Sequence, residues 1–227
     1  TLLGFFVGAI ENNSAEVLVY EDTARRNLQA SRLDQSVVGD VAAVPGVADA
    51  APIGELTLTV DVAGTLTDLS LWGVDLTGPG GPAPIVEGRA PERGEVVVDA
   101  SGADEGFEIG ETITLVPSGI ELAIVGYVED LRYAVLATAY IDFDEWTTIF
   151  EAEFPGTPFV PMSLVGVEAE PGQGAAELGD RITATVAGVE GLERSVAAAA
   201  APGVASISQS FALIIGITFA VVVLVVG

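Results

Sequence analysis

The longest uninterrupted run of apolar residues stands at the end of the chain. Residues 211–227 (FALIIGITFAVVVLVVG) contain no charged residue and no proline. At a rise of about 1.5 Å per residue, a helix of this length covers roughly 25 Å, close to the hydrocarbon thickness of a bilayer. Residues 207–227 are therefore predicted to begin a membrane-spanning helix, with a buried core helix as the alternative. The side chains expected to contact lipid are Phe211, Leu213, Ile214, Ile215, Phe219, Val222, Leu224 and Val225.

A shorter apolar run stands at the other end of the chain. Residues 1–10 (TLLGFFVGAI) have no basic residue before them, whereas a secretory signal has a positive segment and a small-residue cleavage site. We interpret these residues as the end of a preceding transmembrane helix, again with a buried core helix as the alternative. Residues 11–206 then form the body of the protein between two membrane segments.

Within the body, several segments show the period of two that is typical of half-buried strands. In residues 56–62, Leu56, Leu58, Val60 and Val62 alternate with threonine and aspartate. Residues 47–53 lead into this strand, and residues 67–74 are expected to pair with it. Further strands are expected over residues 17–20, 95–99, 112–116, 120–128, 138–141 and 163–168.

Helical periodicity appears in residues 34–44, 142–150, 173–189 and 196–201. Asp34 is expected to cap the first of these helices, and Asp142 the second, with Glu145 as its capping-box partner. The side chains of the second helix expected to face inward are Phe143, Trp146, Ile149 and Phe150. Helices and strands interleave without regular βαβ spacing, so the predicted fold class is α+β, a mixed α/β domain of two subdomains flanked by transmembrane helices.

The segment GPGGPAP (residues 78–84) interrupts this pattern and predicts a linker or a long loop, with a subdomain break near residues 78–94. It is not a phosphate-binding loop, because neither GxGxxG nor a lysine accompanies it.

The carboxylates Asp142, Asp144 and Glu145, which are close to one another in the sequence, resemble a cation site. They lack the glycine and the later acidic residue of a calcium loop, so helix capping is the better interpretation.

Composition excludes several classes of protein. The net charge is −25, the eight basic residues are all arginine, and the chain has no lysine, histidine or cysteine. The chain is therefore not a P-loop NTPase, a Ser-His-Asp or thiol enzyme, or a His/Cys zinc protein. An enzyme that uses paired carboxylates for acid–base catalysis is another possibility, but no pair stands out from ordinary surface acids. We expect no enzyme activity, cofactor or metal, and no nucleic acid partner, since phosphate binding requires a basic face.

The basic residues also bear on orientation and binding. Arg25, Arg26 and Arg32 form a cluster that could contact acidic groups of the envelope, or could pair with carboxylates of the same domain, which is the interpretation we favour. No basic residue occurs before Arg25 or after Arg194. Because cytoplasmic loops beside membrane helices are enriched in lysine and arginine, the body is predicted to lie outside the cytoplasm.

Several short segments, in this order, resemble one family. They are VPGVADAAP (residues 44–52), LWGVD (71–75), EGRAPERGEVVV (87–98), IGETITL (109–115) with LAIVGYV (122–128), and ISQSFAL (207–213). In their order and spacing they resemble the MacB-like periplasmic core domain of FtsX-like ABC-transporter permeases, which is inserted between the first two membrane helices.

The resemblance implies a non-catalytic permease subunit in the cell membrane, multi-pass, with its main domain extracytoplasmic. It implies a separate cytoplasmic ABC ATPase as partner, a homodimer or paired permease, and contact with the lipid bilayer. The implied function is transmission of ATPase-driven motion to export or extract a substrate across the envelope. The alternative is a membrane-tethered envelope binding or sensor domain without a transport role.

Overall fold

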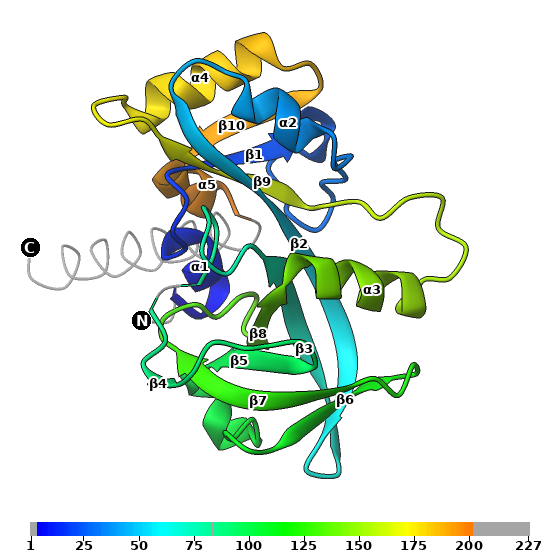
Figure 1. The fold of residues 1–227 in the computed structure, drawn as a ribbon. Coiled ribbons are helices and arrows are strands. Elements are labelled where there is room, and N and C mark those ends of the chain that lie inside the picture. Colours follow the sequence, from blue (N-terminus) through cyan, green and yellow to red (C-terminus); the bar gives the residue numbers. More distant parts are fainter. Residues whose placement is uncertain (1–3, 83, 202–227) are drawn as a thin grey trace, which may run out of the picture.

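The structure is a computed structural model that describes residues 4–82 and 84–201 (Figure 1). The predicted membrane segment 207–227, with Phe211, Leu213 and the other side chains expected to contact lipid, lies outside these residues. Within the described part of the chain, no helix has both the length and the apolar character needed to cross a bilayer.

The described residues form five α-helices, two short 3₁₀ helices and ten strands in one mixed sheet. The α-helices are α1 (Gly4–Glu11), α2 (Val37–Ala42), α3 (Phe143–Glu153), α4 (Ala175–Thr185) and α5 (Arg194–Ala200). The strands are β1 (Val17–Glu21), β2 (Val47–Val62), β3 (Thr65–Val74), β4 (Glu87–Gly88), β5 (Glu95–Asp99), β6 (Thr112–Val116), β7 (Glu121–Val128), β8 (Ala137–Asp142), β9 (Leu164–Ala169) and β10 (Val189–Glu193).

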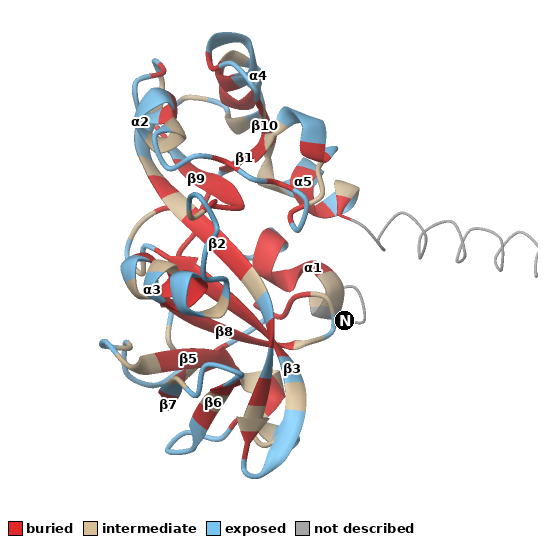
Figure 2. Cartoon of the chain, turned by 90° about the vertical axis from the view of Figure 1, so that its right-hand side faces the viewer, coloured by how far each residue is buried: buried red, intermediate tan, exposed pale blue. Residues whose placement is uncertain are grey.

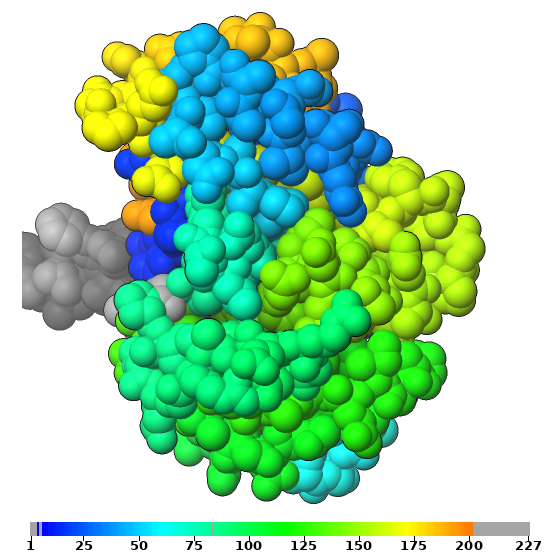
Figure 3. Space-filling view, in the orientation of Figure 1, coloured from blue at the N-terminus to red at the C-terminus, as the bar shows by residue number. Residues whose placement is uncertain are grey.

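The long strand β2 belongs to two lobes, which Figure 3 shows one above the other. Its first half, residues 47–53, pairs with β9, which pairs with β1, which pairs with β10, all antiparallel. These strands, with α2, α4 and α5, are called the sheet lobe. The side chains of β1 alternate between its two faces: Val17 and Val19 pack in the same core as helices α2 and α4, while Leu18 and Tyr20 pack in the core that contains α1 and α5.

The second half of β2 belongs to the barrel lobe. Its residues 53–62 pair with β3, and the pairing continues through β8, β5, β7 and β6 back to β2. The six strands thus close on themselves, with alternate side chains filling the interior. Interior residues include Val60, Leu71, Val98, Leu115 and Leu122, all nearly inaccessible to solvent. Small closed barrels are filled by such side chains, so this lobe is a packed core and not a channel.

The mixed α/β architecture predicted from the sequence is confirmed, as are the strands expected at residues 17–20, 56–62, 67–74 and 95–99 and the hairpin of residues 112–128. Helix α3 buries the expected Phe143, Trp146, Ile149 and Phe150. The segment 78–94 joins β3 to β5, both in the barrel lobe. The predicted subdomain break there does not separate the two lobes, because the chain crosses between them within β2 and between β8 and β9.

Three local predictions are wrong. Helix α2 begins at Val37, because the Asp34 carboxylate accepts hydrogen bonds from the N–H and hydroxyl of Ser36 in a turn before it. Asp142 does cap α3, but Glu145 accepts a hydrogen bond from the Gly94 N–H, 2.7 Å away, instead of completing a capping box. The helix expected over residues 173–189 ends at Thr185, and the chain continues as strand β10.

Candidate functional site: the junction of the terminal helices

Helices α1 and α5 come from opposite ends of the described chain and pack against each other beside the waist of the molecule (Figures 1 and 2). Helix α5 starts directly where β10 ends, at Arg194. The Arg194 N–H donates to the Glu16 carbonyl over 3.0 Å, and the Arg194 guanidinium donates to the carbonyls of Asn13 and Ala15. Arg194 therefore fastens the start of α5 to the segment that leaves α1.

Asn13 ends α1 and turns the chain toward β1. Its side chain is 2 % exposed and fully engaged: Nδ2 donates to the carbonyls of Ala9 (2.9 Å) and Ile10 (3.1 Å), while Oδ1 accepts from the Ala15 N–H (2.9 Å). The last carbonyls of a helix have no partner within the helix, and Asn13 supplies one. The path from α1 into the domain is fixed by these bonds.

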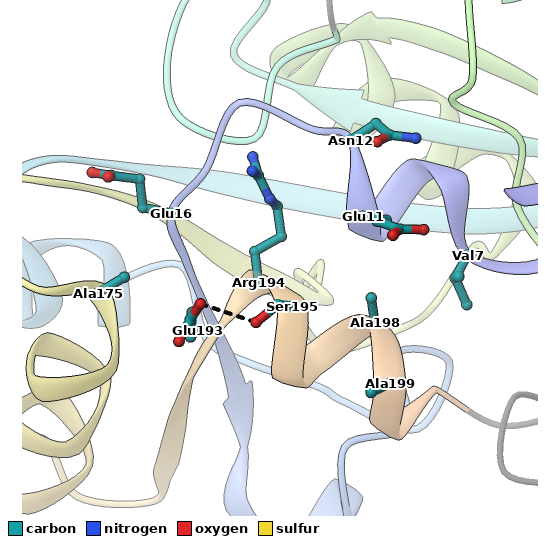
Figure 4. A pocket seen from close by; sticks show the side chains of 10 residues that line it. All are labelled: Val7, Glu11, Asn12, Glu16, Ala175, Glu193, Arg194, Ser195, Ala198 and Ala199. Carbon is teal, nitrogen blue, oxygen red and sulfur yellow. Dashed lines mark hydrogen bonds between the residues drawn. The ribbon is translucent and has the colours of Figure 1, made fainter.

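A groove of about 720 Å³ lies between the two helices (Figure 4). Its charged residues are Glu11 from α1, Glu16 from the linker before β1, Glu193 from the end of β10, and Arg194. Glu193 accepts a hydrogen bond from the Ser195 hydroxyl over 2.9 Å. The apolar part of the lining is small, consisting of Val7, Ala175, Ala198 and Ala199. The groove is thus bordered by two helices in contact, and its lining combines acidic side chains with one arginine.

Helix α1 also contacts the barrel lobe, through residues 129–136, which are called the docking loop. The Ala9 N–H donates to the Arg132 carbonyl and the Ala134 N–H donates to the Phe6 carbonyl, each over 3.1 Å. The Asn12 side chain donates to the Asp130 carbonyl over 2.8 Å. The junction therefore joins α1, α5 and both lobes.

The arginine cluster predicted from the sequence lies away from these contacts, on the loop after β1. Arg26 forms an ion pair with Glu190 of β10 at 2.6 Å, and the hydrogen bond to that carboxylate raises the pKa of the Arg26 guanidinium. The backbone N–H of Arg32 donates to Glu21, and its guanidinium donates to the Ser31 carbonyl. Arg25 stands beside Arg26 in a left-handed backbone conformation, φ 52°.

The residues that build the junction were not singled out from the sequence. Asn13 was not named among the residues predicted from the sequence, and Arg194 was named only as the last basic residue. A polar Asn-Asn-Ser sequence directly after an apolar helix was the one local signal of a helix end. The partnership of Asn13 with a residue 181 positions later has no local signal.

Comparison of the amino-acid sequence with models of protein families shows the family of the chain. Residues 2–185, from α1 through α4, match the sequence model of the MacB-like periplasmic core domain. The chain belongs to this family. It is the extracytoplasmic domain of a permease of the MacB and FtsX type, a component of a membrane ABC transporter.

Solved structures agree with the family's fold. The periplasmic region of MacB from Actinobacillus actinomycetemcomitans is similar with a TM-score of 0.58 at 12 % identity, over 83 % of this chain and 94 % of that one. The extracellular domain of the noncanonic ABC-type transporter YknZ from Gram-positive bacteria gives a TM-score of 0.51 at 18 % identity, over 79 % of this chain and all of the other. None of the curated protein sequences compared with the chain matches it.

Among the described residues, no three acidic side chains are grouped to hold a metal ion. Asp142 and Glu145, which were considered as a cation site, accept backbone hydrogen bonds from Asp144 and Gly94. Arg194 and α5 of this MacB-like domain lie beyond the residues that match the family. The hydrogen bonds of Arg194 nevertheless reach back to the matched segment at Asn13 and Ala15.

Proposed function

We propose that this domain transmits motion driven by a separate cytoplasmic ABC ATPase and thereby exports or extracts a substrate across the cell envelope. The chain itself has no lysine with which to build a P-loop. Membership of a permease family supports the transport role, and the terminal junction supports the transmission of motion.

The observation that carries the proposal is the short, fully bonded connection at both ends of the domain. No residue separates β10 from α5, and only residues 12–16 separate α1 from β1. Asn13 and Arg194 use their side chains to bind that linker to both helices. A displacement of either helix therefore reaches the strands without being absorbed by a flexible loop.

The proposal also includes the membrane helices beside the domain and a second permease subunit. Residues 1–10 continue from a preceding transmembrane helix and residues 207–227 enter the next one. These helices of a multi-pass protein contact the lipid bilayer, while the body, with the buried Val7, Ala9 and Ile10 of α1, lies outside the cytoplasm. A second permease subunit, identical or paired, completes the transporter. The net charge of −25 keeps the body away from anionic lipid headgroups, so its association with the membrane depends on the apolar ends.

Affinity purification of the complete permease tests the partnership. We expect an ABC ATPase to co-elute, and ATP hydrolysis by the purified complex to exceed that of the ATPase alone or to depend on the permease. Absence of any ATPase would overturn the proposal and favour the membrane-tethered binding or sensor domain.

A flexible insertion tests the transmission itself. A Gly/Ser linker near Ser208 is expected to leave ATP hydrolysis intact and to abolish the ability of the gene to rescue a strain that lacks it. The matched control is the same linker in the exposed turn of residues 117–119, between β6 and β7, which should rescue normally. Rescue by both insertions would contradict transmission through this end of the domain.

A further inference from the structure

Each terminal helix is fastened to a different lobe. Helix α5 continues from β10, an edge strand of the sheet lobe, and packs on β10 and β1. Helix α1 is bonded to the docking loop, which precedes β8 of the barrel lobe. The two helices contact each other, yet α5 packs on the sheet lobe while α1 is hydrogen-bonded to the barrel lobe.

The docking loop is held firmly on the barrel side. The Leu131 N–H donates to the buried Asp99 carboxylate, and the Leu131 carbonyl accepts from the Tyr140 hydroxyl, each over 2.7 Å. The Arg132 guanidinium, 7 % exposed as a residue, donates to the Val135 carbonyl and forms an ion pair with Glu105. These bonds connect the loop to β5, β8 and the 3₁₀ helix after β5.

The backbone of the docking loop is unusual. Asp130, Ala134 and Val135 have φ of 58°, 51° and 67°, a region that residues with a Cβ rarely occupy and that is most costly for β-branched valine. Such conformations persist only where surrounding contacts enforce them. Here the enforcing contacts include α1, through the Phe6 carbonyl and the Asn12 side chain.

Contact between α1 and this loop requires a glycine. A Cβ at Gly8 would lie 2.6 Å from the Asp130 carbonyl oxygen and 3.1 Å from that of Arg132. Because both atoms belong to the backbone, neither can turn aside. Gly8 therefore sets how closely α1 approaches the barrel lobe.

Strand β2 is the one strand of the described sheet that both lobes share, and a glycine, Gly54, stands where they meet. Gly54 of β2 pairs directly with Gly73 of β3, and the indole of Trp146 covers both. Glycine gives a strand more conformational freedom than any other residue. The middle of β2 is thus the natural place for a change of angle between the lobes.

We propose that relative displacement of α1 and α5 rotates the two lobes about the middle of β2, so that the domain changes its internal shape when the membrane helices move. This rests on the proposed function. The groove of about 720 Å³ between the helices leaves room for such a displacement.

The test uses spin labels on the complete permease, to which residues 1–227 contribute no cysteine that would compete for labelling. Asp180→Cys on α4 and Ser118→Cys in the β6–β7 turn place one label on each lobe, both at exposed positions. Asp68→Cys with Ser118→Cys places both labels on the barrel lobe as a control. Distances are measured by double electron–electron resonance.

Gly8→Ala is the deciding variant, and Gly39→Ala is its matched control. Both change one helical glycine, but a Cβ at Gly39 meets nothing within 4 Å. We expect Gly8→Ala to shift or broaden the distance between the lobes and to leave the distance within the barrel lobe unchanged. Asn12→Ala, which removes only the exposed bond to Asp130, should act in the same direction to a smaller extent and covers the case in which Gly8→Ala fails to fold.

An unchanged distance between the lobes in Gly8→Ala and Asn12→Ala would overturn the inference. So would an ATP-dependent change in the complete complex that moves labels on different subunits but leaves the distance between the lobes fixed; in that case the proposed function would still stand. Failure to recover any ATPase would overturn the proposed function, while the Gly8→Ala comparison would still decide how α1 controls the lobes.

Discussion

At the scale of single residues, two side chains do most to join the chain ends. The Asn13 side chain donates to the Ala9 carbonyl in α1 and accepts from the Ala15 N–H after the helix. The Arg194 guanidinium donates to the carbonyls of Asn13 and Ala15, which stand 181 and 179 positions earlier in the chain. Hydrogen bonds from a charged donor contribute about 1.5–3 kcal/mol each, more than those between neutral groups. The junction therefore depends strongly on Arg194.

Arg194→Ala is expected to lower the free energy of unfolding by about 1–3 kcal/mol, because it leaves the carbonyls of Asn13 and Ala15 without this donor. Urea titration of the domain measures the loss. Arg93→Ala is the control: Arg93 is exposed, and its replacement should change stability by no more than about 0.5 kcal/mol. Equal stability of the two variants would contradict the role given to Arg194.

Glu55 carries a buried carboxylate near the middle of β2. Burial raises the pKa of the Glu55 carboxyl above its ordinary value, while hydrogen bonds from Ser70 and Thr57 and the charge of Arg32 partly oppose that rise. The folded protein therefore holds this proton to higher pH than the unfolded chain does. Stability from this group is full below the unfolded pKa and is lost as pH rises through the folded pKa.

Glu55→Gln removes that titration and keeps an oxygen that can accept from Ser70. The variant is expected to gain stability relative to the parent as pH rises from about 4 to 8, measured as the difference between their urea midpoints. A difference that stays constant over this range would show that Glu55 ionises in the folded protein as readily as in the unfolded chain, and a reversed trend would show that it ionises more readily; either would contradict the raised pKa.

At the scale of elements, local patterns predicted strands well where aliphatic residues alternate with polar ones, as in the second half of β2 and in β6. Strand β10 was missed because Val-Glu-Gly-Leu-Glu lacks that alternation and follows a helical pattern directly. Its strand conformation comes from pairing with β1, residues 17–21 against 189–193. Such partnerships between distant segments cannot be read from either segment alone.

Helix α3 illustrates what the sequence does and does not contain. Its periodicity predicted the inward face, including Trp146, but not the seat on Gly54 and Gly73. The indole stacks on Phe143, with ring centroids 5.5 Å apart, and contacts Phe150 at 5.6 Å. Asn13 is a similar case: its residue type after an apolar run indicates a helix end, but its hydrogen bond with Arg194 could not be predicted from the sequence.

Trp146→Ala is expected to cost about 3–5 kcal/mol of stability, since it empties the space between α3 and the strands at the point where the lobes meet. Phe154→Ala, at the exposed end of the same helix, should cost no more than about 1.5 kcal/mol. Thermal and urea unfolding monitored by circular dichroism compare the two. Similar costs would mean that α3 is not anchored through Trp146.

At the scale of the whole molecule, we propose that the two lobes, the shared strand and the paired terminal helices act as one mechanical unit in an ABC-transporter permease. The family match covers most of that unit, although the resemblance in sequence to solved relatives is only 12–18 %. What is retained at such identity is the overall fold.

Hydrogen–deuterium exchange on the complete permease with its ATPase tests the central claim most directly. The informative amides are those of Ala9, Ala15, Ala134 and Arg194, whose bonds tie the terminal helices to the domain. Adding a non-hydrolysable ATP analogue should change their exchange roughly fivefold or more, equivalent to about 1 kcal/mol, and leave Leu115 in the β6–β7 hairpin unaffected. Unaltered exchange at all four junction amides, in a complex that binds the nucleotide, would contradict the account.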